Sequence, residues 1–334
     1  MSTPFSEKRT RPGYVVAIVL ALLLASRIEF VAAEQNYPAK PVRIIYPSGT
    51  GSTGEVRTRI LADKLSQRLG QRFIVETRPG ASTTIGTALV AAAPPDGYTL
   101  LSTFTPAFPI GPYLYEAARY DPVTSFTAIG TFSRGSPTLI VNPSVPAKTL
   151  KEFVALAKAN PGAIEIAHGG VGGANHLPAE LFIRAAGIRV LLVPYKGEGA
   201  ALPDLLGGQV DALFAYSAVA VPQLKAGKVR ALAVASVERN HAAPEVPTFA
   251  EAGFPGFHFD ATMLLLGPAG LPQDIVALLN REIASILQES DVRATYEATG
   301  SKPVSGSPQD AAALIKREME INGGLVKELG IVLE

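Results

Sequence analysis

The sequence contains no cysteine, and this absence removes several classes of protein at once. Without a thiol the chain can form no structural disulfide, use no cysteine nucleophile and carry no lipid on an N-terminal cysteine. Tryptophan is also absent, so a binding pocket must be walled by tyrosine, phenylalanine and aliphatic side chains. Such walls suit a ligand held by backbone amides and hydroxyl groups better than a sugar stacked on indole rings.

The chain also lacks an excess of charge of either sign, because its formal net charge is +1 over 334 residues. This balance favours neither a nucleic acid nor an anionic membrane surface as a partner. Apolar residues make up 47% and charged residues 18% of the chain, which is typical of a globular protein rather than a disordered one. A chain of this length is expected to form two lobes or one large domain.

The local motifs of common hydrolases, ATPases and metalloenzymes are missing: the sequence has no G-x-S-x-G, no Walker loop and no H-E-x-x-H. Two of the four histidines, His168 and His176, flank a glycine-rich loop. Their spacing, without an acidic neighbour, favours capping and turn roles over the alternative of a metal pair. We therefore predict no catalytic residue, no cofactor and no metal, and expect that the protein is not an enzyme.

Residues 1–33 have the organisation of a secretory signal peptide. A positively charged start is followed by an apolar run over residues 14–26 and by small residues up to Ala33 that offer a cleavage site. An uncleaved membrane anchor is the alternative, but the run is shorter than the roughly 20 apolar residues that a spanning helix needs. We expect export to the periplasm.

Segments with strand-like and helical patterns alternate along the first part of the remaining chain. Strands are expected over residues 42–46, 72–76 and 98–104, separated by helices over residues 55–69 and 84–93. This βαβαβ start predicts parallel strands with helices on both faces of the sheet.

A second α/β unit follows an irregular, proline-rich stretch. Its strands are expected over residues 138–141, 164–167, 190–193, 212–215 and 230–235, with helices near 150–159, 176–186, 201–206 and 221–226. One further strand, 262–266, is followed only by helices, near 273–289, 291–298 and 308–329. Because such a tail has no sheet of its own, we place it on the first unit and predict lobe 1 as residues 37–137 and 258–334, and lobe 2 as residues 138–257. Two crossovers would then join the lobes, and such a chain can hinge.

A glycine-rich loop, Gly49 to Gly54, separates the first strand from the first helix and satisfies G-x-G-x-x-G. With Glu76 at the end of the second strand, it matches a dinucleotide-binding fingerprint. Pro47 and Ser48 interrupt the direct turn that the fingerprint needs, and export argues against a cytoplasmic cofactor. Both interpretations share amide and hydroxyl groups at the positive end of a helix dipole, which suit an anion; the alternative is a turn that only caps its own helix.

The second lobe contains a similar loop, Gly169 to Ala174, after a predicted strand and before a predicted helix. It again directs amide donors away from the carboxyl edge of a sheet. Two such loops on hinged lobes would face each other across a cleft; the alternative is a flexible turn.

The chain after the signal peptide resembles the substrate-binding receptors of tripartite tricarboxylate transporters, the Bug family. The resemblance rests on short motifs in matching order over nearly the whole length, including Tyr37–Ile45, Glu76–Gly80, Pro95–Leu100, Val193–Gly197, Asp204–Gly208, Glu251–Gly256 and Gly267–Gly270. It implies an α/β, two-lobed type II periplasmic-binding-protein fold with two interlobe crossovers.

The resemblance also implies a function. The protein is expected to be a monomeric receptor that captures a small organic carboxylate in the interlobe cleft and delivers it to membrane permease subunits. The expected ligand-binding residues are Ser48, Thr50, Gly51, Ser52, Thr53, Thr103, Gly172, Gly173, Ala174 and Tyr216. A receptor that presents its ligand to a membrane sensor kinase, or an exported nucleotide-binding enzyme, would be the alternatives.

This chain departs from the family pattern inside the expected site. Ser48 replaces an aromatic residue, Thr50 a proline and Ser52 a glycine, while Ala215 and Tyr216 stand where the family commonly has Asp-Asn. A more hydroxylated loop and a less acidic, more aromatic wall follow from these changes. We hypothesise that Tyr216 packs on the body of the ligand and favours an aromatic or longer-chain carboxylate over small tricarboxylates.

Overall fold

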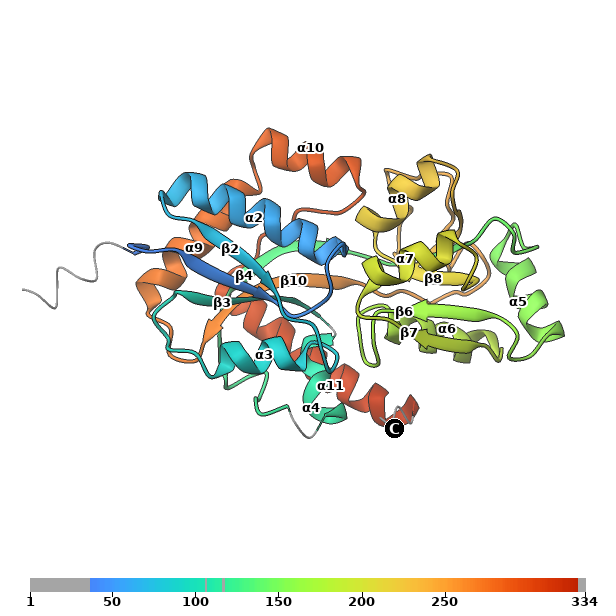
Figure 1. Cartoon of the computed structure of the whole chain (residues 1–334), viewed down its shortest axis with the longest axis horizontal. Helices are drawn as coiled ribbons and strands as arrows, with labels where there is room; N and C mark the ends of the chain where they lie inside the picture. Colours follow the sequence, from blue (N-terminus) through green and yellow to red (C-terminus); the bar gives the residue numbers. More distant parts are fainter. Residues whose placement is uncertain (1–36, 106, 116–117, 330–334) are drawn as a thin grey trace, which may run out of the picture. The chain divides into compact units, whose positions relative to one another are not determined.

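The computed structural model describes residues 37–105, 107–115 and 118–329 of the chain (Figure 1). The predicted signal peptide, residues 1–33, lies outside the described residues. Within the described ranges, no helix combines the length and the apolar character that crossing a membrane requires.

The first sheet contains five strands in the order β2-β1-β3-β10-β4. Its strands are β1 (Val42–Tyr46), β2 (Phe73–Thr77), β3 (Thr99–Phe104), β4 (Phe126–Gly135) and β10 (Ala261–Pro268). The first three are parallel, as the βαβαβ pattern predicts, and β10 runs antiparallel between β3 and β4. Every residue of β10 is buried, so this strand from the later part of the chain lies in the interior of the sheet.

Helices from both ends of the chain cover the first sheet (Figure 1). They are α2 (Thr53–Leu69), α3 (Thr84–Ala91), α4 (Ala107–Leu114), α9 (Gln273–Ile286), α10 (Ser290–Ala298) and α11 (Pro308–Leu329). Helices α9 and α11 contact β4, and α2 contacts α9. The C-terminal helices therefore pack on the first sheet, and we call this sheet with its helices lobe 1.

The second sheet has the order β7-β6-β8-β5-β9. Its strands are β5 (Thr138–Val141), β6 (Glu165–His168), β7 (Leu191–Pro194), β8 (Ala212–Ala215) and β9 (Arg230–Val234). Its helices are α5 (Leu150–Ala159), α6 (His176–Ala186), α7 (Glu198–Leu206) and α8 (Ser217–Lys225). Phe182 contacts both Phe214 and Phe249 in an aromatic core between sheet and helices. This sheet with its helices is lobe 2.

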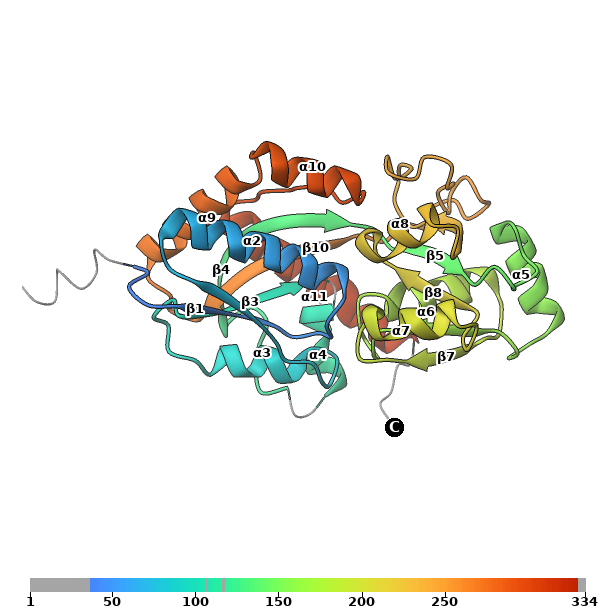
Figure 2. The same ribbon diagram turned by 45° about the horizontal axis from the view of Figure 1, so that its top comes forward.

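The chain passes between the two lobes twice, from β4 to β5 and from β9 back to β10 (Figure 2). The α/β, two-lobed fold with two crossovers is therefore confirmed. The exact lobe boundaries, at residues 137/138 and 257/258, stay a prediction. Two elements of the stretch that we expected to be irregular are regular: α4, and β4, which supplies the outer edge of the first sheet.

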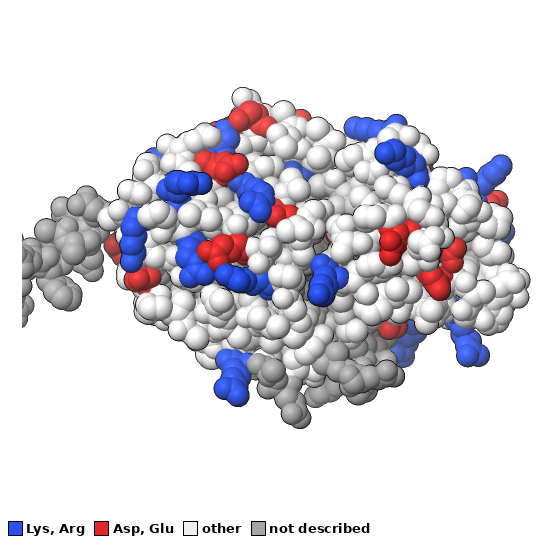
Figure 3. All heavy atoms as spheres, in the orientation of Figure 1, with Lys and Arg blue, Asp and Glu red and all other residues white. Residues whose placement is uncertain are grey.

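The charged side chains on one face of the molecule are not gathered by sign. On the face that Figure 3 shows, basic and acidic residues are interspersed. Where α2 meets α9 and α10, Lys64 lies 2.6 Å from Glu289 and Arg68 lies 2.6 Å from Glu282. This face has no large patch of one sign that would steer an anion toward it.

Candidate functional site

A cavity of 360 Å³ lies where the loops of the two lobes meet. Lobe 1 lines it with residues 46–49, 52–54, 57 and 79–83, and lobe 2 lines it with residues 169–171, 173–175, 194–198 and 216–217. Phe104, Ser133, Ala261 and Met263, from the sheet strands of lobe 1, also line it. The volume is within the range of pockets that enclose small organic molecules.

The loop between β1 and α2 forms one wall of the cavity, and its own helix shapes it. Ser52 is the N-cap of α2, and its hydroxyl accepts a hydrogen bond of 3.3 Å from the N–H of Glu55. The hydroxyl of Tyr46, at the end of β1, lies 3.0 Å from the same Ser52 oxygen. The N–H of Gly51 donates to the Glu55 carboxylate over 2.6 Å. One of the predicted amide donors is therefore already bonded to a carboxylate of this chain.

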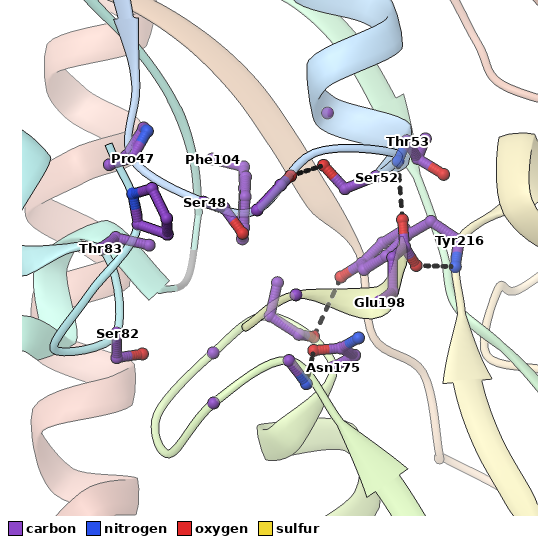
Figure 4. Close-up of a pocket in the computed structure, with 18 of the residues that line it drawn as sticks. Pro47, Ser48, Ser52, Thr53, Ser82, Thr83, Phe104, Asn175, Glu198 and Tyr216 are labelled. Atoms are coloured by element: carbon purple, nitrogen blue, oxygen red, sulfur yellow. Dashed lines mark hydrogen bonds between the residues drawn. The ribbon is translucent and has the colours of Figure 1, made fainter. Parts of the chain in front are cut away.

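Glu198 of lobe 2 binds the start of the lobe 1 helix α2 (Figure 4). One oxygen of its carboxylate accepts the N–H of Thr53 at 2.7 Å, and the other accepts the N–H of Tyr216 at 2.8 Å. Thr53 is the first residue of α2, and Tyr216 is the N-cap of α8, so one carboxylate satisfies two helix N-termini. Because Glu198 is only 5% exposed, burial raises the pKa of its carboxyl despite the two amides. We call this arrangement the Glu198 clasp.

The clasp brings the two backbones so close that side chains are excluded. A Cβ atom at Gly49 would lie 1.8 Å from the carbonyl oxygen of Lys196 in lobe 2. A Cβ atom at Gly199 would lie 2.3 Å from the carbonyl oxygen of Thr50 in lobe 1. Both glycines are therefore required by the close approach of the lobes.

Two histidines hold the glycine-rich loop of lobe 2. The Nδ1 atom of His168 accepts the N–H of Gly170 at 3.3 Å, and the Nδ1 atom of His176 accepts the N–H of Gly172 at 3.2 Å. Burial lowers the pKa of His168 to about 4 and that of His176 to about 3, so both rings are neutral at pH 7. These are turn and capping roles. Among the described residues, no group of three or more potential metal ligands occurs.

Two further amides of this loop also have partners within the chain. The side-chain oxygen of Asn175, the N-cap residue of α6, accepts the N–H of Gly169 at 2.9 Å. The N–H of Gly173 donates to the carbonyl of Gly170 at 2.9 Å. Tyr216 reaches this loop from α8, because its hydroxyl donates to the carbonyl of Ala174 at 3.1 Å. The loop therefore forms part of the cavity wall, and most of its backbone amides donate hydrogen bonds that stabilise the loop itself.

The loop between β2 and α3 is a part of the site that sequence reasoning missed. Ala81, Ser82 and Thr83 have φ angles of 42°, 43° and 78°, a left-handed conformation that is strained for residues other than glycine. The hydroxyl oxygens of Ser82 and Thr83 are buried without a hydrogen-bond partner, as is that of Thr53 across the cavity. Strained backbone and unpaired polar atoms are features expected of functional sites, so this loop joins the candidate site.

Six of the ten predicted ligand-binding residues line the cavity: Ser48, Ser52, Thr53, Gly173, Ala174 and Tyr216. The other four, Thr50, Gly51, Thr103 and Gly172, are not among its lining residues. Thr103 lies fully buried within β3, and a Cβ atom at Gly172 would lie 2.3 Å from Leu114 of α4. Thr50 and Gly51 are exposed, and their backbone lies against Gly199 of lobe 2. The ten assignments stay predictions.

Glu76, the acidic residue of the dinucleotide-like pattern, is engaged elsewhere. Its two carboxylate oxygens accept hydrogen bonds of 2.7 and 3.0 Å from the guanidinium of Arg43 on the neighbouring strand. It is not among the residues that line the cavity. The acidic group that a ribose would need is therefore used in a pair within the sheet.

Comparison with known proteins places this architecture among receptors. A family model described as tripartite tricarboxylate transporter family receptor matches residues 57–331. The protein BugT of Bordetella pertussis is 32% identical over 321 residues, which cover 96% of this chain and 98% of BugT. Two solved structures from Rhodopseudomonas palustris are also similar. Rpa4515 with adipate has a TM-score of 0.83 at 30% identity, covering 89% of this chain and 99% of its own. MatC with bound malate has a TM-score of 0.81 at 31% identity, covering 85% and 98%.

Proposed function

This chain belongs to the tripartite tricarboxylate transporter receptor family, and from this we propose that it captures a small organic carboxylate between its lobes and delivers it to a membrane permease. The proposal includes export to the periplasm through the signal peptide over residues 1–33, action as a monomer, and binding without catalysis. Two relatives hold small carboxylates, adipate and malate, in their solved structures. A further solved relative, BugD, is a periplasmic binding protein, which supports the proposed location.

The interlobe cavity is the observation that carries this proposal. It is of a size for a small organic molecule, and its lining includes the unpaired hydroxyls of Thr53, Ser82 and Thr83. Hydroxyl donors from both ends of the cavity suit an acceptor-rich ligand such as a carboxylate. Because Thr53 and Glu198 belong to different lobes, a ligand in this cavity would favour the closed arrangement over an open one.

Among the predicted ligand-binding residues, Tyr216 bears on ligand size. Its hydroxyl and its amide are both engaged, so its ring rather than its polar atoms is left for the ligand. This supports the hypothesis that Tyr216 packs on the body of an aromatic or longer-chain carboxylate. Stabilisation of the protein by citrate alone would contradict that hypothesis.

Native mass spectrometry of gently purified protein, followed by calorimetric titration, tests the proposed function. Suitable acids are succinate, malate, adipate, citrate and benzoate, with glucose as an uncharged control and adenosine triphosphate as the test for a nucleotide enzyme. We expect binding of at least one acid and none of glucose or nucleotide. Binding of nucleotide without any acid would contradict the proposal. Deletion of the gene, followed by separate uptake and signalling assays, distinguishes delivery to a permease from presentation to a sensor kinase.

A further inference from the structure

Arg57 is a buried cation in the wall of the cavity. It lies one turn into α2, its side chain is 0% exposed, and it is among the residues that line the cavity. Arginine is almost never fully buried in proteins unless it is paired. Sequence reasoning passed over this residue, because a charged position near a helix start is usually solvated.

The hydrogen bonds of Arg57 go only to neutral groups. Its Nη2 atom donates to the hydroxyl of Ser301 at 2.9 Å and also to the hydroxyl of Thr299. The guanidinium carbon lies 4.3 Å from the centre of the Tyr296 ring, which is a cation–π contact. The Nε and Nη1 atoms are buried and have no acceptor. Among the described residues, no carboxylate forms an ion pair with Arg57.

The unpaired state of Arg57 contrasts with that of the buried acids nearby. The Glu55 carboxylate is paired with Arg59 and bonded to the amide of Gly51, while Glu198 holds two amides in the clasp. Both carboxylates therefore already have hydrogen-bond or ion-pair partners other than Arg57. Burying a charge without a counter-charge is costly, so the missing partner of Arg57 is expected to come from outside the chain.

The surroundings of Arg57 fit an anionic oxygen group. Ser133, Ser217 and Ser301 line the cavity with it and add hydroxyl donors. The hydroxyl of Ser217 in lobe 2 lies 3.0 Å from that of Ser301 in lobe 1, and Ser301 also accepts the hydrogen bond from Arg57, so the two lobes meet beside the guanidinium. The unpaired hydroxyls of Ser82 and Thr83 come from a different loop, on the side of the cavity away from Thr53 (Figure 4).

We propose that Arg57, with Ser133, Ser217 and Ser301, forms a subsite that binds one carboxylate of a dicarboxylate ligand, while the loop of Ser82 and Thr83 receives the other end. This inference rests on the proposed function, since it names the ligand class for the same cavity. Arg57 would be the residue that selects a diacid over a monoacid, because a monoacid leaves either the guanidinium or the far hydroxyls without an acceptor.

Calorimetric titration of adipate and of hexanoate, a monoacid of the same chain length, tests this subsite. We expect the wild-type protein to bind adipate more tightly than hexanoate. Arg57→Met should weaken adipate binding at least about tenfold and hexanoate binding by less, because the single carboxylate of hexanoate can bind the far hydroxyls instead, and so remove the discrimination. Arg57→Lys keeps the charge and should retain part of it. Arg68→Met, near the end of the same helix in a surface ion pair, is the control and should bind as wild type.

Thermal melting without ligand separates this role from a structural one. If Arg57 is a ligand-binding residue, removing an unpaired buried charge should leave the melting temperature of Arg57→Met unchanged or raise it. A large drop in melting temperature with unchanged adipate binding would overturn the inference, as would an equal loss of adipate and hexanoate binding. If the wild-type protein binds no acid at all, the proposed function itself fails; if it binds adipate and Arg57→Met binds adipate equally, only this subsite fails.

Discussion

The two glycine-rich loops that face the cavity carry the same sequence signal but have different electrostatics. In lobe 1, the amides of Gly51 and Thr53 are bonded to carboxylates, those of Glu55 and Glu198. In lobe 2, the loop amides are bonded to neutral acceptors, such as the imidazoles of His168 and His176. The first loop therefore behaves as an anion-binding helix start, and the second as a locally braced turn.

This difference shows why a glycine loop at a helix start is an incomplete indicator of a ligand site. Both loops offer amide donors, and in both the chain itself supplies acceptors. The groups left for a ligand are side-chain donors that the glycine pattern does not reveal, namely the hydroxyls of Thr53, Ser82 and Thr83 and the guanidinium of Arg57. Recognition is thus expected to depend on side chains around the loops more than on their backbones.

The largest expected effect on ligand affinity comes from the close contact between Gly49 of lobe 1 and Lys196 of lobe 2. Gly49→Ala places a methyl group where the Lys196 carbonyl lies in the closed form, so the lobes cannot close fully. If binding needs the closed form, affinity for the acid that the wild-type protein binds should fall about 100-fold, measured by calorimetry. Gly324→Ala, at an exposed position with no atom within 4 Å of the added Cβ, is the matched control. Unchanged affinity in Gly49→Ala would show that this contact is not needed for binding.

The second prediction concerns the free energy of unfolding and its dependence on pH, which arises at the glycine-rich loop of lobe 2. The pKa of His168 is about 4 in the folded protein and about 6.5 in the unfolded chain. Between these two pH values the unfolded chain is protonated at His168 and the native state is not. The free energy of unfolding should therefore fall as the pH decreases from about 6.5 to about 4, by on the order of 3 kcal/mol for this residue, with His176 adding to the fall. The raised pKa of Glu198 acts in the opposite direction, because the native state then keeps a proton that the unfolded chain releases.

Denaturant titrations between pH 7 and pH 4 measure this dependence. The variant His168→Gln keeps an acceptor for the loop but cannot gain the proton, so its stability should change less over this range. His258→Gln, at an exposed position, should retain the wild-type slope. A slope that is identical in His168→Gln and wild type would mean that His168 is not held neutral by burial.

The third prediction concerns the Glu198 clasp and is measured as a change in the population of closed molecules. Glu198→Ala leaves the amides of Thr53 and Tyr216 without acceptors in the closed form, at a cost of about 1–3 kcal/mol for each buried donor. Opening lets water satisfy both amides, so the closed population should fall, and small-angle X-ray scattering should report a larger radius of gyration. Glu152→Ala removes a comparable carboxylate at the start of α5, within lobe 2, and should leave the radius unchanged. Equal radii in Glu198→Ala and wild type would argue against the clasp.

Much of the fold was predictable because its signals are local. The βαβαβ start and most elements of the second unit follow from apolar runs of strand length, helical spacing and glycine or proline stops. Strand β4 was missed because Gly130, Ser133 and Gly135 break its pattern, and because its partner β10 lies more than a hundred residues away in the chain. A strand defined by a distant partner leaves a weak local signal.

The site was less predictable because its decisive contacts are between distant residues. Glu198 appears in the sequence as a surface charge, and only the folded chain brings it to Thr53. Helix α2 shows the same limit, because the apolar side chain of Val56 is 40% exposed while the charged side chain of Arg57 is buried. A buried arginine contradicts the pattern of apolar residues that sequence reasoning uses, and such conflicts are expected at functional sites.

The distance between the lobes is the measurement that tests the central claim most directly, namely that the lobes close on a carboxylate. Because the chain has no cysteine, spin labels can be attached through Ala155→Cys on α5 and Ala294→Cys on α10, both at exposed positions. Pulsed electron paramagnetic resonance then reports the interlobe distance in the wild-type and Glu198→Ala backgrounds. The account predicts that Glu198→Ala lengthens the distance without ligand, and that excess succinate, malate, adipate, citrate and benzoate, added together, shorten it again. A distribution that is the same in both backgrounds, with and without the acids, would contradict it.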